Sequence, residues 1–90
     1  MKNVKVQNMS GNHGPVKNQF VIYTEDGVYF QSYSTIVVFK PYGDDRKVQL
    51  DKDWDYSRTT AKYRNKFLGE TKAETARKIL LGEYEVVNLN

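Results

Sequence analysis

The chain has 90 residues, with fourteen basic and eleven acidic side chains, a net charge of +3 and no cysteine. A chain of this length supports one hydrophobic core, so we expect residues 1–90 to form a single domain. The lack of cysteine excludes disulfides and thiolate metal sites and is compatible with a reducing compartment. The mild positive charge permits a nucleic-acid partner without requiring one.

The first residues predict a short edge strand. Val4 and Val6 alternate with Lys5 and Gln7, and lysine is common on strands at the edge of a sheet. An edge from Lys2 to Met9 could pair between two copies and so form a homodimer; the sequence does not decide between this state and a monomer. No apolar run after Met1 is long enough for a signal peptide or a membrane span. We therefore expect a soluble protein.

Residues 10–15 concentrate turn-forming side chains and predict a loop with His13 in solvent. The next two segments, 19–24 and 28–33, are rich in β-branched and aromatic residues and predict a hairpin. We expect a three-residue loop, Glu25 to Gly27, with Gly27 at positive φ. That register places Phe20, Ile22, Val28 and Phe30 on one face. A two-residue turn would instead group Val21 and Tyr23 with Val28 and Phe30, but it separates the apolar residues less well.

Two further strands follow. Residues 34–40 contain a continuous apolar run, which is typical of a strand buried on both faces, and residues 46–50 return after a turn. Asp51, Asp53 and Asp55 then alternate as at the start of a calcium loop. The later positions disagree with such a loop, because Tyr56 stands where glycine is needed and Lys62 where the bidentate glutamate is needed. We therefore interpret these aspartates as turn and helix-entry residues.

The stretch from Trp54 to Gly69 predicts a helix of about ten residues that ends at Leu68. Four side chains recur at steps of four, three and four and define its packing side: Tyr56, Thr60, Tyr63 and Phe67. Four polar or basic side chains cover the opposite side: Arg58, Lys62, Asn65 and Lys66. Ser57, Thr59 and Thr60 are candidate N-caps, and Gly69 suits the left-handed position after the last turn.

A second helix starts at a capping box formed by Thr71 and Glu74 and ends near Gly82. Its apolar stripe is predicted to be Ala73, Ala76, Ile79 and Leu80. Residues 83–88 alternate well enough for a last strand. The fold class is therefore α+β, a small antiparallel β-meander of about five to six strands packed against two short helices in the C-terminal half.

Four strings in the sequence carry a resemblance to a known family: Asn18-Gln19-Phe20, Tyr29-Phe30-Gln31-Ser32-Tyr33, Trp54-Asp55-Tyr56-Ser57 and the run from Lys62 to Glu70. Over most of its length the chain resembles small uncharacterised proteins of bacteriophages and related mobile elements. That family has no assigned activity, so no functional residue carries over. The resemblance implies a phage accessory protein in the cytoplasm of a bacterial host cell. Such proteins commonly bind nucleic acid or obstruct a host defence complex.

The sequence predicts a non-enzymatic protein without cofactor or metal, because it contains no nucleophile elbow, P-loop or dinucleotide-binding glycine motif and only one histidine. The candidate binding surface is basic and aromatic: Trp54, Arg58, Lys62, Arg64, Lys66, Tyr29 and Tyr33. Our first hypothesis is docking on a host protein or ribonucleoprotein complex, for instance a CRISPR-type or other defence effector. The alternative is direct nucleic-acid binding, with phosphate contacts from the first helix and aromatic stacking on bases.

Overall fold

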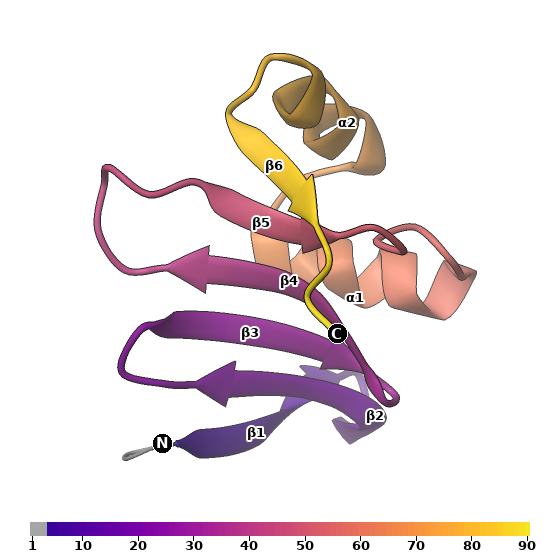
Figure 1. Cartoon of the computed structure of the whole chain (residues 1–90). Coiled ribbons are helices and arrows are strands. Elements are labelled where there is room, and N and C mark those ends of the chain that lie inside the picture. Colours follow the sequence, from indigo (N-terminus) through magenta and orange to yellow (C-terminus); the bar gives the residue numbers. More distant parts are fainter. Residues whose placement is uncertain (1–3) are drawn as a thin grey trace.

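The computed structural model describes residues 4–90 and contains a six-stranded sheet with two helices packed against one of its faces (Figure 1). Lys2 and Asn3, which belong to the predicted edge strand, lie outside the described residues. The strands are β1 (Lys5–Gly11), β2 (Gly14–Tyr23), β3 (Gly27–Ser32), β4 (Thr35–Pro41), β5 (Val48–Asp51) and β6 (Tyr84–Val87). The helices are α1 (Arg58–Leu68) and α2 (Lys72–Leu80).

Strand order in the sheet follows chain order, β1-β2-β3-β4-β5-β6. The first five strands form an antiparallel meander, which confirms the predicted α+β fold class. The last strand differs from the meander because it lies parallel to β5. A parallel neighbour needs a long crossover, and both helices lie within the crossover from β5 to β6.

The helix side of the sheet follows from the strand register. One row crosses all six strands: Gln7, Val21, Phe30, Val38, Leu50 and Val86. Phe30, Val38 and Leu50 are fully buried and form the core with Met9 and Val37. Tyr63 and Phe67 of α1 pack against this cluster, so the predicted packing side of the first helix is confirmed at these two residues.

The predicted register of the β2–β3 hairpin is wrong. Tyr23 pairs with Val28 and Val21 with Phe30, so the loop runs over four residues, Thr24–Gly27. The Thr24 hydroxyl closes the loop by hydrogen bonds to Gly27. Gly27 is not at positive φ either. Glycine fits this position because the backbone of β4 at Lys40 and Pro41 leaves no room for a side chain. A Cβ on Gly27 would lie 2.7 Å from Pro41 Cα.

Local signals set the ends of α1. The Ser57 hydroxyl accepts a hydrogen bond from the Thr60 amide, and Gly69 is left-handed at φ 70°. Both positions were among those predicted. The capping box of α2 is also present, with Thr71 and Glu74 bonded reciprocally. The predicted apolar stripe of α2 is confirmed at Ile79, which packs against the core. It is wrong at the other three positions, since Ala73 and Ala76 are exposed, Leu80 is 85% exposed, and Thr75 is the buried residue.

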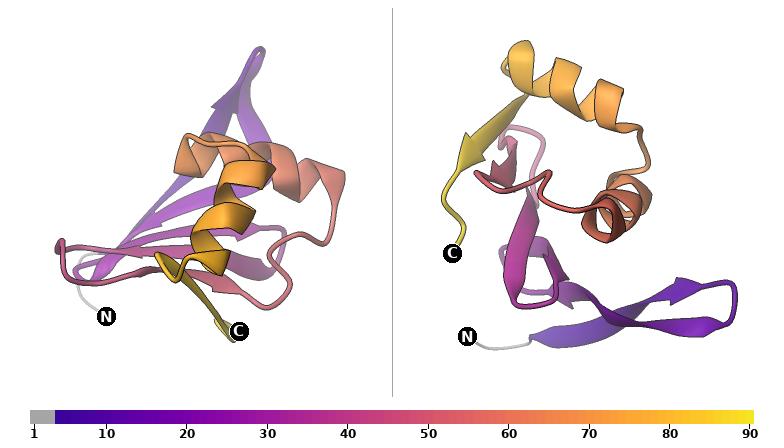
Figure 2. Two further views of the ribbon diagram at one scale, coloured as in Figure 1. Left: turned by 90° about the horizontal axis from the view of Figure 1, so that it is seen from above. Right: turned by 90° about the vertical axis from the view of Figure 1, so that its right-hand side faces the viewer.

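The β1–β2 hairpin is longer than predicted. β1 continues to Gly11 and β2 begins at Gly14, so only Asn12 and His13 remain in the turn. The hairpin extends away from the rest of the sheet on the side that carries the helices, below α1 (Figure 2, right). α1 therefore lies against two surfaces, the sheet behind it and this hairpin beside it.

The end of the chain is fixed to the middle of the sheet. The Asn90 side chain accepts a hydrogen bond from the Ile36 amide at 2.8 Å and donates one to the Ile36 carbonyl at 2.9 Å. The Asp51 carboxylate accepts from the Leu89 amide at 2.8 Å. The side-chain amide of Asn90 thus makes two hydrogen bonds to the backbone of β4, as a residue of a neighbouring strand would. The bonded residue, Ile36, lies next to the register shift in the β3–β4 pairing.

Candidate functional site

The exposed side of α1 carries a row of three cations, Arg58, Lys62 and Lys66, which we call the α1 cation row. They stand four residues apart, so successive side chains lie on one side of the helix about 6 Å apart along its axis. The first turn of α1 contains no acidic residue. Arg58 therefore adds its charge to the positive end of the helix dipole.

The carboxylates that could neutralise these cations are engaged elsewhere. Three ion pairs occur within residues 4–90, and none includes the α1 cation row. Asp55 pairs with Arg64 and Lys72, and Glu70 pairs with Lys78. The carboxylates of Asp55 and Glu70 are thus bound to Arg64, Lys72 and Lys78, and the α1 cation row has no carboxylate partner among the described residues. Lys66 also donates a hydrogen bond to the Ser10 carbonyl, which ties α1 to β1.

Arg64 is a correction to the predicted binding surface. Its side chain is fully buried, with the guanidinium 4.8 Å from the centre of the Trp54 ring. It donates hydrogen bonds to the Trp54 carbonyl and to Asp55 and Asn65. Arg64 follows Thr60 by four residues and so shares the packing side of the helix. It is a structural residue that cannot contact phosphates in this arrangement.

The predicted aromatic residues are dispersed. Trp54 is half-buried against the core. Tyr29 is paired with Ile22 on the opposite face of the sheet and stacks on Phe39 with centroids 4.4 Å apart. Tyr33 is 50% exposed and lies in the turn between β3 and β4. The structure therefore brings Arg58, Lys62 and Lys66 together but places none of these three aromatic residues in the same row.

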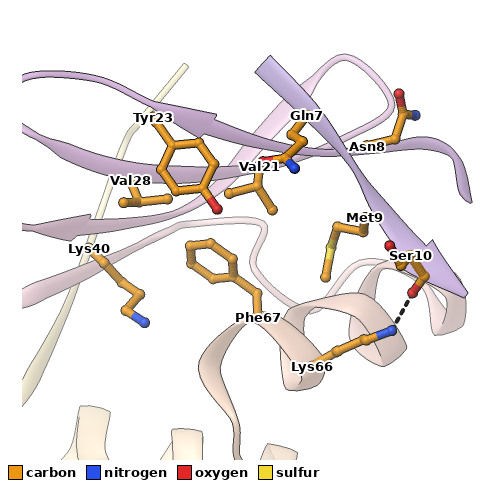
Figure 3. Close-up of a pocket in the computed structure, with 10 residues that line it drawn as sticks. All are labelled: Gln7, Asn8, Met9, Ser10, Val21, Tyr23, Val28, Lys40, Lys66 and Phe67. Atoms are coloured by element: carbon orange, nitrogen blue, oxygen red, sulfur yellow. Dashed lines mark hydrogen bonds between the residues drawn. The ribbon is translucent and has the colours of Figure 1, made fainter. Parts of the chain in front are cut away.

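A groove opens at the end of the α1 cation row, between α1 and strands β1 to β4 (Figure 3). Its volume is about 450 Å³, within the range of ligand pockets. The apolar part is formed by Met9, Val21, Val28 and Phe67. The polar part is formed by Gln7, Asn8, Ser10, Tyr23, Lys40 and Lys66. In Figure 3 the Phe67 ring lies opposite Val21 and Val28, with the two lysines on its flanks.

The groove exists because α1 ends before the sheet does. Gly69 terminates the helix after Leu68, so the row that crosses β2, β3 and β4 at Tyr23, Val28 and Lys40 is approached only by Phe67 in the last turn of α1. No carboxylate is among the described residues around this groove. The Lys40 ammonium lies 5.2 Å from the centre of the Phe67 ring, an arrangement that holds it over the apolar part.

Sequence reasoning missed the groove because it depends on the hairpin register. Tyr23 lies on the face of Val28 and Phe30 in the observed pairing, as it would with the two-residue turn, but not with the three-residue loop that we expected. The alternating order of Val21 and Tyr23 was the available signal, but Phe20 and Ile22 gave an equally good apolar face.

A smaller hollow of about 240 Å³ lies on the other side of the contact between Lys66 and Ser10. The turn between β1 and β2 supplies Asn12 and His13, and α1 supplies Lys62 and Tyr63. It also has no carboxylate among its described lining residues. The α1 cation row is therefore bordered by two open hollows, one at its centre and one at its end.

Hydrogen bonds lower the pKa of three carboxylates near α1. Lys72 has the largest effect on Asp55, and Arg64 adds to it, so the pKa of Asp55 lies below its usual value. Burial raises the pKa of Glu70, but donors from Thr75, Lys78 and Tyr84 outweigh it and the net shift is downward. Burial likewise raises the pKa of Asp51, and the Leu89 and Asp53 amides reverse the shift. These groups stabilise the fold as anions.

Comparison with known proteins gives a family. A family profile described as a family of unknown function, DUF8033, matches residues 4–83. The chain belongs to this family. No curated protein and no solved structure matches the chain. The match carries no indication of viral origin, so the phage setting of this DUF8033 chain stays a prediction.

Across residues 4–90, no group of three or more histidine, aspartate or glutamate side chains is arranged to hold a metal ion. No helix in the same part of this DUF8033 chain has the length and apolar character needed to cross a bilayer.

Proposed function

We propose that this protein is a non-enzymatic binding protein that docks on an acidic surface of a partner protein or nucleoprotein complex. The contact surface consists of the α1 cation row, Arg58, Lys62 and Lys66, together with the groove beside it. A complex of a bacterial defence system is one such partner, in keeping with the phage-like setting expected from the sequence.

The observation that carries this proposal is the segregation of charge. Lys72 and Lys78 of α2 and the buried Arg64 have carboxylate partners, whereas the α1 cation row and Lys40 form no ion pair among the described residues. Unpaired cations arranged in a line attract an acidic surface and increase the rate of association. An apolar groove beside such a row matches the usual pattern of an apolar interface centre with a polar rim.

The aromatic residues favour a protein partner over direct nucleic-acid binding. Stacking on bases requires an exposed aromatic face beside the phosphate-binding cations. Tyr29 lies on the other face of the sheet, and Trp54 is covered on one side by Arg64. Direct nucleic-acid binding is therefore the alternative to protein docking, and the experiment is designed to distinguish the two.

The experiment compares three tagged proteins in a bacterial lysate, with and without nuclease. The first is the wild type and the second carries Lys62→Gln and Lys66→Gln. The third carries Arg46→Gln and Lys47→Gln, which remove the same charge from the exposed loop between β4 and β5. We expect a nuclease-resistant partner that the wild type and the loop variant retain and the helix variant loses.

The captured partner is then purified and mixed with each protein. A defined stoichiometry and a loss of affinity of about tenfold or more in the helix variant would support docking. Capture that disappears with nuclease, and direct binding of oligonucleotides with a steep salt dependence, would replace it by nucleic-acid binding. Equal capture by both variants would overturn the proposed surface.

A further inference from the structure

The groove between α1 and strands β1 to β4 has an apolar part, which a surface that binds its partner by charge alone would not need. It is apolar at its base, where Val21 and Val28 lie opposite Phe67, and it is large enough for a bulky side chain at about 450 Å³. The polar groups at its rim include the Lys40 and Lys66 ammonium groups and the hydroxyl of Tyr23, which is 39% exposed. A purely electrostatic contact would leave the apolar base exposed to water.

We infer that the groove receives a short extended segment of the partner in which a large apolar side chain is flanked by carboxylates. The apolar side chain lies against Val21, Val28 and Phe67, and the carboxylates pair with Lys40 and Lys66. This occupant is part of the partner protein, so its assignment rests on the proposed function.

Charge complementarity selects the flanking residues. Lys40 and Lys66 stand on two sides of the groove, and none of its described lining residues is acidic. Neither lysine forms an ion pair with any residue from 4 to 90. A segment with basic residues beside its apolar side chain would bring like charges together, which is unfavourable.

The position of β1 favours an extended segment. β1 is the first strand in the sheet, and no strand among residues 4–90 pairs with its outer edge. Free edges pair with extended segments, whose backbone supplies hydrogen bonds while pockets select alternate side chains. The Ser10 carbonyl already accepts a bond from a group outside the strand ladder, the Lys66 ammonium.

Three acetylated and amidated peptides serve as probes. The first has leucine between two acidic residues on each side, the second has glycine in place of leucine, and the third has lysine in place of every acidic residue. Binding is followed by NMR on the isotope-labelled full chain. We expect the leucine peptide to bind about tenfold or more tightly than the glycine peptide, because it buries an apolar side chain. Methyl shifts should appear at Met9, Val21 and Val28.

A matched pair of variants tests the location. Gln7 and Val6 are neighbours on β1 and both are exposed, but Gln7 is paired with Val21 on the groove side and Val6 with Ile22 on the other face. Gln7→Trp should fill the groove and remove the preference for leucine over glycine. Val6→Trp should leave that preference unchanged, and its spectrum reports on folding independently.

The possible results separate the groove from the proposed function. Equal binding of the leucine and glycine peptides, with shifts confined to the α1 cation row, would overturn the groove assignment and leave charge-driven docking standing. Binding of the lysine peptide as tight as that of the acidic one would overturn the charge argument. No binding of any peptide at millimolar concentration would overturn the assignment, while the lysate experiment would still decide the proposed function.

Discussion

The Arg64 guanidinium lies over the Trp54 ring, 4.8 Å from the ring centre, and donates a hydrogen bond of 2.9 Å to the Trp54 carbonyl. The same group pairs with Asp55 at 3.1 Å. Arg64 therefore fixes the loop before α1 to the helix that follows. An arginine that the sequence suggests for a partner is used within the fold.

Replacing Arg64 with lysine should lower the free energy of unfolding by about 2–4 kcal/mol. A lysine ammonium cannot stack and donate in several fixed directions at once, and each lost bond to a charged group contributes about 1.5–3 kcal/mol. Urea unfolding followed by Trp54 fluorescence measures the change. Lys62→Gln is the control and should stay within about 0.5 kcal/mol of the wild type. An unchanged midpoint for Arg64→Lys would show that the stacked geometry is not required.

Replacing Gly27 with alanine should lower the free energy of unfolding by about 2–3 kcal/mol, since a Cβ would meet the Lys40 carbonyl and lie 2.7 Å from Pro41 Cα. Gly69→Ala gives the comparison, because Gly69 is left-handed but has open space around it and should lose only about 1 kcal/mol. Thermal melts of both variants would decide between the two causes. A smaller loss at Gly27 than at Gly69 would contradict the close approach.

Truncating Phe67 to alanine should lower the free energy of unfolding by about 3 kcal/mol. Its ring stacks against Phe30 with centroids 5.7 Å apart and packs on the core. For a domain of this size the loss corresponds to a fall in melting temperature of more than about 10 °C. Phe67→Leu should retain most of the stability. Equal melts for Phe67→Ala and the wild type would refute the packing side of α1.

Acid should unfold the protein partly through Glu70. This carboxylate accepts hydrogen bonds from Thr75 at 2.6 Å, Lys78 at 2.9 Å and Tyr84 at 2.7 Å. Burial raises the pKa of Glu70, but the hydrogen bonds from these three donors lower it by more than burial raises it. The pKa in the folded protein therefore lies below the ordinary 4.5. The unfolded chain therefore binds more protons in this range, and stability is lost as the pH falls through 4.5 and below.

Glu70→Gln should accordingly be less stable than the wild type near neutral pH and lose less additional stability in acid. Urea midpoints between about pH 7 and about pH 3 test this difference. Glu83→Gln is a suitable control, because Glu83 is exposed. A Glu70→Gln variant that follows the wild-type pH dependence would exclude Glu70 as a source of acid sensitivity.

Features that depend on neighbouring residues were predictable from the sequence. The caps of α1 at Ser57 and Gly69 and the capping box of α2 require only residues within one helical turn. The alternating and apolar runs located the strands for the same reason. These signals together were enough for the α+β class.

Features that depend on distant contacts were not predictable. Both faces of β2 carry apolar residues, so pattern alone could not choose the hairpin register. Two distant contacts accompany the observed register: Phe67 of α1 packs on one face of the hairpin, and Pro41 of β4 lies close to Gly27. Arg64 was misassigned because its charge suggests solvent, whereas its spacing from Thr60 places it on the packing side. Thr75 is buried instead of the alanines, and its hydroxyl donates a hydrogen bond to Glu70, a contact that the apolar pattern does not reveal.

The parallel pairing of β6 with β5 has a consequence for how the protein folds. Each of the first four strand pairs joins neighbours in the chain, and hairpins of this kind form within about 1–10 μs. The pair of Asp51 with Val87 must instead wait until both helices have been placed between the two strands. Closing such a long loop carries an entropic penalty that local pairs avoid. The Asn90 contact with Ile36 therefore forms among the last, and pulsed hydrogen exchange should show β6 gaining protection after β2 and β3.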